Sequence, residues 1–206
     1  MASVSRLNGF RPVKFNTGAP YTGAASVYFV PASNADVIMV GDVVKLAGDG
    51  RSPTGVPTVA RHAGGATEAA VGVVVGILYT GVGDAQNVPP VTDLNTPVYR
   101  RASTDRYLLV ADDPSLIFEA QASASGSFTT ADVGLNAGIR ATAGSTTAGS
   151  SGMDVDLAAK AATATLPLKI VGFPYRPDNS VGDAFVSLYV TINNHQYKGG
   201  TGTAGV

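Results

Sequence analysis

The side chains best suited to chemistry are two histidines and a few paired acids. His62 and His195 lie in different segments, and neither has a companion at the spacing of metal ligands. A serine hydrolase needs a histidine beside an acid and an exposed serine elbow, and the chain contains no GxSxG motif. We interpret both histidines as surface or hairpin-end residues.

The paired acids are Asp112/Asp113 and Asp154/Asp156. The first pair precedes a proline and a serine and is typical of a turn. The second pair could bind calcium through its oxygen atoms, but the spacing of a calcium loop is missing. Two distant carboxylates could serve a glycosidase, although the chain has no tryptophan for a sugar-binding cleft. We expect a protein that is not an enzyme and holds no metal or cofactor.

Arg100, Arg101 and Arg106 form the densest basic cluster. Adjacent arginines in a strand point to opposite faces, so these side chains do not form one phosphate-binding stripe. The net charge of −1 also argues against a nucleic-acid partner, because binding to phosphates needs clustered Lys and Arg. We expect the arginines to form salt bridges within the fold or to a neighbouring subunit.

The composition narrows the class of protein further. The 206 residues suit one large or two small domains. The absence of cysteine excludes disulfides and thiolate chemistry. Only 14% of residues are charged, and a surface this poor in charge is often partly covered by other protein. The first residues contain no apolar stretch typical of a secretory signal, so we expect the protein to act where it is made.

The run VGVVVGILYTG (71–81) shows which kind of element can position these side chains. A membrane helix needs about 20 apolar residues, roughly twice this length. A phosphate-binding loop needs Lys and then Ser or Thr after its glycines, which are absent here. The β-branched valines favour a buried strand, with Gly72 and Gly76 at a bend or bulge.

Residues 36–97 are predicted to form a small β-barrel domain and its connector. The segment GDVVKLAGDG (41–50) is interpreted as a strand between two Gly/Asp turns. A polar insert, RSPTGVPTVARHAGGATE, separates it from the strand in 71–81. Residues 81–97 are the connector, rich in glycine and proline.

Residues 98–197 are predicted to form a second, antiparallel β-rich domain. Its clearest feature is a hairpin over 166–193, whose second strand alternates with a period of two. One face of that strand carries Val186, Leu188, Val190 and Ile192. Further strands are expected at 98–101, 107–111 and 116–121. The low-complexity stretch 122–165 should hold one short helical turn capped by Thr129 or Thr130, and its weak helical candidate is 154–164.

Residues 1–35 are predicted to form an extended N-terminal arm. Prolines interrupt any helix there, and no acid precedes Asp36. Interleaved aromatic and basic side chains suit docking onto another protein, and the alternative is a strand tied down on its own domain. The residues predicted to bind the partner are Arg6, Phe10, Arg11, Lys14, Phe15 and Tyr21. Residues 198–206 are expected to be a flexible tail.

Several segments of this mainly β chain resemble virion proteins of tailed bacteriophages. GDVVKLAG followed by AAVGVVVGIL resembles the small β-barrel segment of capsid decoration, or cement, proteins. YLLVADDPSLIFEAQ, FTTADVGLNAGI and RPDNSVGDAFVSLYVTINNHQY are similar to parts of other virion structural proteins. The likeness lies in short phrases, and it transfers no functional residue.

The resemblance implies a virion protein on the outer surface of an icosahedral capsid, made in the host cytoplasm. It would bind the major capsid protein and stabilise the contacts between capsid subunits, as a homo-oligomer with a trimer favoured. No nucleic acid or membrane is expected as a partner. Two other functions stay open: a virion surface module that binds host glycans, and a hydrolase with carboxylate catalysis.

Overall fold

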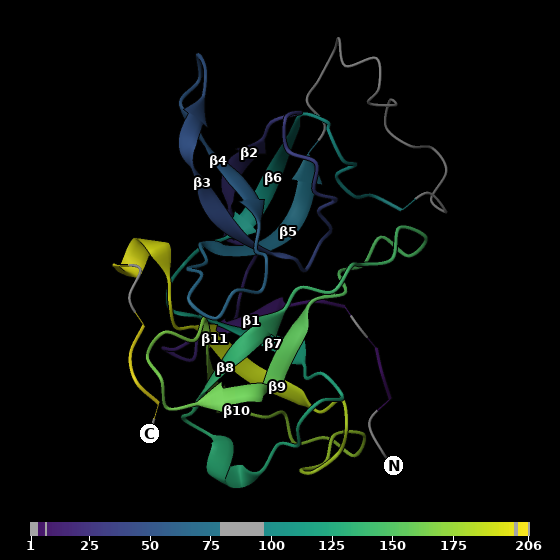
Figure 1. Cartoon of the computed structure of the whole chain (residues 1–206), viewed down its shortest axis with the longest axis vertical. Coiled ribbons are helices and arrows are strands. Elements are labelled where there is room, and N and C mark those ends of the chain that lie inside the picture. Colours follow the sequence, from purple (N-terminus) through teal and green to yellow (C-terminus); the bar gives the residue numbers. More distant parts are fainter. Residues whose placement is uncertain (1–3, 7, 79–96, 200–201, 206) are drawn as a thin grey trace.

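The chain folds into two β halves stacked along the long axis of the molecule (Figure 1). The structure, a computed structural model, describes residues 4–6, 8–78, 97–199 and 202–205. Strands make up 44% of it and helices only 3%, which confirms the predicted mainly β class.

The upper half in Figure 1 is a ring of five strands in the order β2-β4-β3-β5-β6. Strand β6 also pairs with β2, so the ring closes into a small barrel. Its interior is apolar: Val30, Val44, Val74, Leu108 and Val110 are all fully buried. The strands are β2 (Ser26–Val30), β3 (Val43–Arg51), β4 (Val56–Arg61), β5 (Gly72–Leu78) and β6 (Arg106–Ala111).

Strand β5 is the buried strand predicted from VGVVVGILYTG, and β6 confirms the strand predicted at 107–111. The register of β5 against β6 shifts between Val74 and Gly76, which places a bulge at the predicted glycine. Gly72 has a different role. A Cβ atom at Gly72 would lie 2.4 Å from the carbonyl oxygen of Ala111, so only glycine allows this close approach of the two strands. The last residues of the predicted run, from Tyr79 onward, and the connector up to residue 96 lie outside the described residues.

The internal boundaries predicted for the barrel are wrong in two places. Strand β3 runs through the predicted turn at 48–50, and the chain turns at 52–55 instead. Strand β4 comes from the stretch that we interpreted as a polar insert. In addition, β2 and β6 come from outside the predicted range 36–97. Strands β2, β4 and β6 are only five or six residues long, and they become buried by pairing with strands from other parts of the chain. The local sequence does not encode that pairing.

The lower half is a six-stranded sheet in the order β1-β7-β11-β10-β8-β9. It curls so far that β9 returns to the end of β7, where the Ser123 amide donates to the Val155 carbonyl at 2.8 Å. Phe118, Leu157, Leu168 and other side chains buried to 0–1% exposure fill its concave side. The strands are β1 (Arg11–Phe15), β7 (Leu116–Gln121), β8 (Asn136–Arg140), β9 (Asp154–Ala161), β10 (Leu168–Gly172) and β11 (Ser187–Ile192).

Strands β10 and β11 confirm the predicted hairpin. They pair antiparallel, and Val186, Leu188 and Val190 are fully buried, as the period-two pattern predicts. The short helix η1 (Thr130–Asp132) begins after Thr129, also as predicted. Strand β7 confirms the strand predicted at 116–121. The predicted strand at 98–101 contributes only an isolated bridge at Arg100, and the weak helical candidate 154–164 is strand β9.

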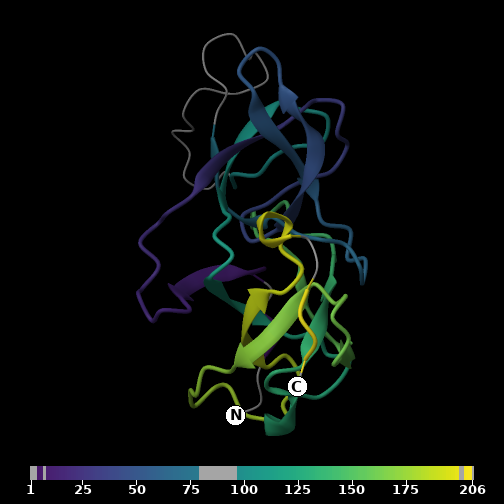
Figure 2. The same ribbon diagram turned by 90° about the vertical axis from the view of Figure 1, so that its left-hand side faces the viewer.

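The predicted extended arm is folded onto its own chain. Strand β1 pairs with β7 and β2 pairs with β6, and Phe10 is only 2% exposed in the core. The structure therefore shows the alternative that the sequence left open, an N-terminal strand tied down on its own domain. The connection at 16–25 is mostly exposed and runs along the outside of the molecule (Figure 2).

The described part of the predicted flexible tail is held against the sheet. The Thr203 amide donates to the Asn193 side chain at 2.9 Å, and Asn136 donates to the Thr203 carbonyl at 2.8 Å. A Cβ atom on Gly202 would lie 2.2 Å from the Ala164 carbonyl oxygen, so the tail fits a narrow slot. The side chains of Asn136 and Asn193 thus form hydrogen bonds with the backbone of the tail. The sequence of the tail has no periodicity from which these contacts could be predicted.

One hydrophobic cluster spans the two halves, beside a second cluster inside the barrel, and a buried polar link also joins the halves. Val43 and Val73 of the barrel belong to the same buried cluster as Phe118 of the sheet. Asp42, 1% exposed, accepts from Ser151 Oγ at 2.6 Å and pairs with Arg61 at 3.2 Å. Burial raises the pKa of Asp42, against the opposing effect of Arg61.

Candidate interaction cleft

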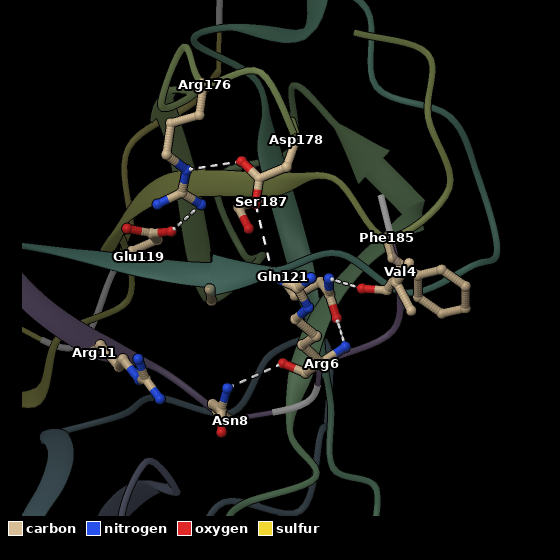
Figure 3. A pocket seen from close by; sticks show the side chains of 12 residues that line it. Val4, Arg6, Asn8, Arg11, Glu119, Gln121, Arg176, Asp178, Phe185 and Ser187 are labelled. Carbon is tan, nitrogen blue, oxygen red and sulfur yellow. Dashed lines mark hydrogen bonds and ion pairs between the residues drawn. The ribbon is translucent and has the colours of Figure 1, made fainter. Parts of the chain in front are cut away.

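A cleft of about 470 Å³ lies in the lower half, between the N-terminal residues and the loop that joins β10 to β11 (Figure 3). Its floor is the end of β7 and the start of β11, which are neighbouring strands of the sheet. Its lining residues are Val4, Arg6, Asn8, Gly9, Arg11, Glu119, Ala120, Gln121, Arg176, Asp178, Phe185 and Ser187.

The side chain of Gln121 fixes the N-terminal wall. Its amide nitrogen donates to the Val4 carbonyl at 2.9 Å, and its carbonyl oxygen accepts from the Arg6 amide at 2.7 Å. The side chain thus pairs with the N-terminal segment as a neighbouring peptide group would. Asn8 extends the wall by donating to the Arg6 carbonyl at 3.3 Å.

The opposite wall is braced by the buried side chain of Asn179, which is 3% exposed. Its oxygen accepts from the Ser187 amide at 2.7 Å, and its nitrogen donates to the Pro174 carbonyl at 2.8 Å. A tight turn closed by the Asn179 amide then presents Arg176 and Asp178 to the cleft. At the end of the loop Phe185 adopts a φ of 58°, a conformation that costs an aromatic residue strain energy.

The charges in the cleft are unequal. Three arginines line it, against the two carboxylates of Glu119 and Asp178. Arg176 pairs with Glu119 at 2.7 Å, and both Arg176 and Arg6 lie 3.7 Å from Asp178. The guanidinium of Arg11 has no hydrogen bond or ion pair with any residue that the structure describes (Figure 3). Both carboxylates are therefore paired with arginines, and Arg11 is the arginine of the cleft without a pairing partner among the described residues.

The structure brings only two of the six predicted partner-binding residues to this cleft, Arg6 and Arg11. Phe10 is buried in the core, so its predicted role in docking is not compatible with this fold. Lys14 lies over the Tyr189 ring, 5.5 Å from its centre, while Phe15 and Tyr21 are half-buried against the core.

The other charged residues of the cleft were not predicted from the sequence: Glu119, Arg176 and Asp178. Their side chains meet because β7 and β11 pair, and that pairing joins residues about seventy positions apart. The only signal in the sequence is the polar run RPDN at 176–179, which lies within the hairpin predicted over 166–193.

The histidines were predicted to be surface or hairpin-end residues, and the surface position is wrong, because His62 and His195 are 0% and 1% exposed. Burial lowers the pKa of both. His62 Nδ1 accepts from the Gly64 amide at 3.0 Å, and His195 Nδ1 accepts from the Tyr197 amide at 3.1 Å. Both rings therefore have structural roles at loop ends.

A second polar cluster lies where η2 (Gln196–Lys198) meets the barrel. The Tyr28 hydroxyl donates to Asp112 at 2.7 Å and lies 2.9 Å from the Tyr197 hydroxyl. Burial and these hydrogen bonds raise the pKa of Tyr28, so it stays protonated. Ser26 donates directly to Asp112 at 3.1 Å, with no histidine between them, so the cluster is not a nucleophilic triad.

The paired acids are occupied by structural contacts. Asp113 accepts from the Ser115 amide at 2.7 Å and shapes the predicted turn. Asp154 is fully buried beside Arg140, and Asp156 accepts from the Ala158 amide at 3.0 Å. Within the described ranges, no three histidine, aspartate or glutamate side chains gather as metal ligands would.

Comparisons with known proteins assign no family to the chain: no family model, no curated protein and no solved structure matches it. Among the described residues there is also no helix with the length and apolarity to cross a membrane.

Proposed function

We propose that the protein is a structural component of a phage virion that binds the outer surface of the icosahedral capsid. It stabilises contacts between major capsid protein subunits and catalyses no reaction. The observation that most supports this is the cleft, because it joins Arg6 and Arg11 of the predicted docking segment to a rigid β-sheet. The resemblance of its sequence segments and its low charge, 14% of residues, also support the proposal.

A protein of this kind acts as a clamp and needs rigidity rather than reactive groups. Two β halves with a shared core provide a rigid body. If the protein forms a homotrimer, one oligomer contacts several capsid subunits at once, and each later contact is effectively intramolecular. Light scattering on the purified protein tests the trimer directly.

The test is co-sedimentation of the purified protein with expanded phage capsids that lack it. We expect saturable binding and greater resistance of the capsids to heat. Deleting residues 1–6 removes one wall of the cleft but leaves Phe10 and β1 in place, and should weaken attachment. Arg101→Ala on the barrel, which removes one exposed positive charge, is the control. A wild-type protein that never sediments with capsids refutes the proposal.

Binding of a host glycan is the second candidate function. It is favoured by Tyr175, which is 93% exposed immediately before Arg176 of the cleft and could stack on a sugar ring. A glycan array separates the two functions: a hit that depends on Tyr175, without capsid binding, supports the glycan-binding function.

A further inference from the structure

We propose that the cleft binds a carboxylate side chain on an exposed segment of a partner protein, with Arg11 as the ion-pairing residue and Tyr175 as a contact at the rim. The identity of that partner as a capsid subunit rests on the proposed function, whereas the chemistry of recognition does not.

The incoming group must be anionic. Both carboxylates of the cleft already pair with arginines, at 2.7 Å for Glu119 and 3.7 Å for Asp178. The guanidinium of Arg11 is the group without a described partner, and it lies on the exposed first residue of β1. A guanidinium presents parallel N–H donors that match the two oxygens of a carboxylate.

One carboxylate fits better than a phosphate. Three arginines against two acids leave a single positive charge in excess. A carboxylate neutralises that charge, whereas a phosphate dianion carries one negative charge more than the cleft can balance. The volume of about 470 Å³ is also suited to one or two side chains.

The surroundings of the cleft favour a protein as the partner. Tyr175 is 93% exposed, and large exposed aromatic residues next to arginine are typical of protein interfaces. Phe185, with its strained φ of 58°, lines the same cleft, and backbone strain of this kind collects at binding sites. Gln121 and Asn179 hold both walls in place, so little ordering energy is lost on binding.

The experiment uses two capped pentapeptides that differ only in a central glutamate or glutamine, followed by NMR of the full-length protein. We expect the glutamate peptide to shift the amide signals of Arg11, Gln121 and Arg176. Its affinity should exceed that of the glutamine peptide by about tenfold, as for charge-assisted hydrogen bonds. Arg11→Gln should abolish the difference, and the exposed control Arg101→Gln should retain it.

Three outcomes overturn the inference: equal shifts from both peptides, shifts outside the cleft, or an unchanged preference in Arg11→Gln. Carboxylated glycans that bind in the cleft when neither peptide does would also overturn it. The capsid assay separates the two proposals. If wild type and Arg11→Gln sediment equally well with capsids, the assignment of a capsid subunit as the partner of the cleft fails, and the function stands. If the glutamate peptide binds but wild type never sediments with capsids, the function fails and the cleft chemistry stands.

Discussion

Replacing Arg100 with methionine tests whether a buried cation organises the barrel. Arg100 is fully buried, and its guanidinium donates five hydrogen bonds. The acceptors are carbonyl oxygens of Pro31, Asn34, Asp36 and Thr104 and the Asn34 side chain, rather than the carboxylates that we predicted. One side chain therefore holds the loop between β2 and β3 in a single shape.

The size of the effect follows from these bonds. A hydrogen bond from a charged donor contributes about 1.5–3 kcal/mol, but five such values do not add. Much of the loop at 31–36 is exposed, so its carbonyl groups regain water once the guanidinium is gone. We expect Arg100→Met to lower the free energy of unfolding by about 3 kcal/mol. For a chain of this length the Tm should then fall by roughly 6–12 °C.

Urea unfolding and calorimetry measure this loss, with Arg101→Met as the matched control because its side chain is exposed. Arg100→Lys should fall between the two, since an ammonium group has three donors where Arg100 uses five. Hydrogen exchange at 31–36 should quicken in Arg100→Met alone. If Arg100→Met unfolded at the same urea concentration as Arg101→Met, the buried guanidinium would not stabilise the loop.

Three further substitutions test other features. Gly72→Ala should lower the free energy of unfolding in urea by about 1–3 kcal/mol, because the added Cβ atom overlaps the next strand. The control Gly172→Ala places its Cβ atom in open space and should leave that free energy almost unchanged. His195 has a pKa below its usual 6.5, so the unfolded chain binds more protons there and stability falls as the pH drops below about 6.5. His195→Asn keeps an acceptor for the Tyr197 amide but does not titrate. Its free energy of unfolding should therefore fall less than that of wild type between about pH 7 and pH 5, and an identical fall would contradict this. Gly202→Ala should displace residues 202–205 from the slot, because the added Cβ atom overlaps the Ala164 carbonyl oxygen. Carboxypeptidase should then digest the C-terminal residues faster than in wild type, and an unchanged rate of digestion would refute this prediction.

The sequence alone determined the β class and several strands, because their signals are local. Val186, Leu188 and Val190 alternate with polar residues, and a period of two places them on one face wherever the strand lies. The valine-rich run of β5 and the Asp113 turn are equally local, since they depend on side-chain shape and on hydrogen bonds within a few residues.

Only the tertiary structure decided where the ends of the chain lie and what the charged residues do. Phe10 enters the core and Thr203 enters its slot through contacts with residues far away in the sequence. Arg100 was predicted to form salt bridges, yet it is buried among carbonyl groups that two separate segments supply, the loop at 31–36 and Thr104. The cleft likewise exists only because β7 and β11 pair beside the N-terminal residues. Such long-range pairing depends on the burial of whole surfaces, and no short stretch of residues encodes it.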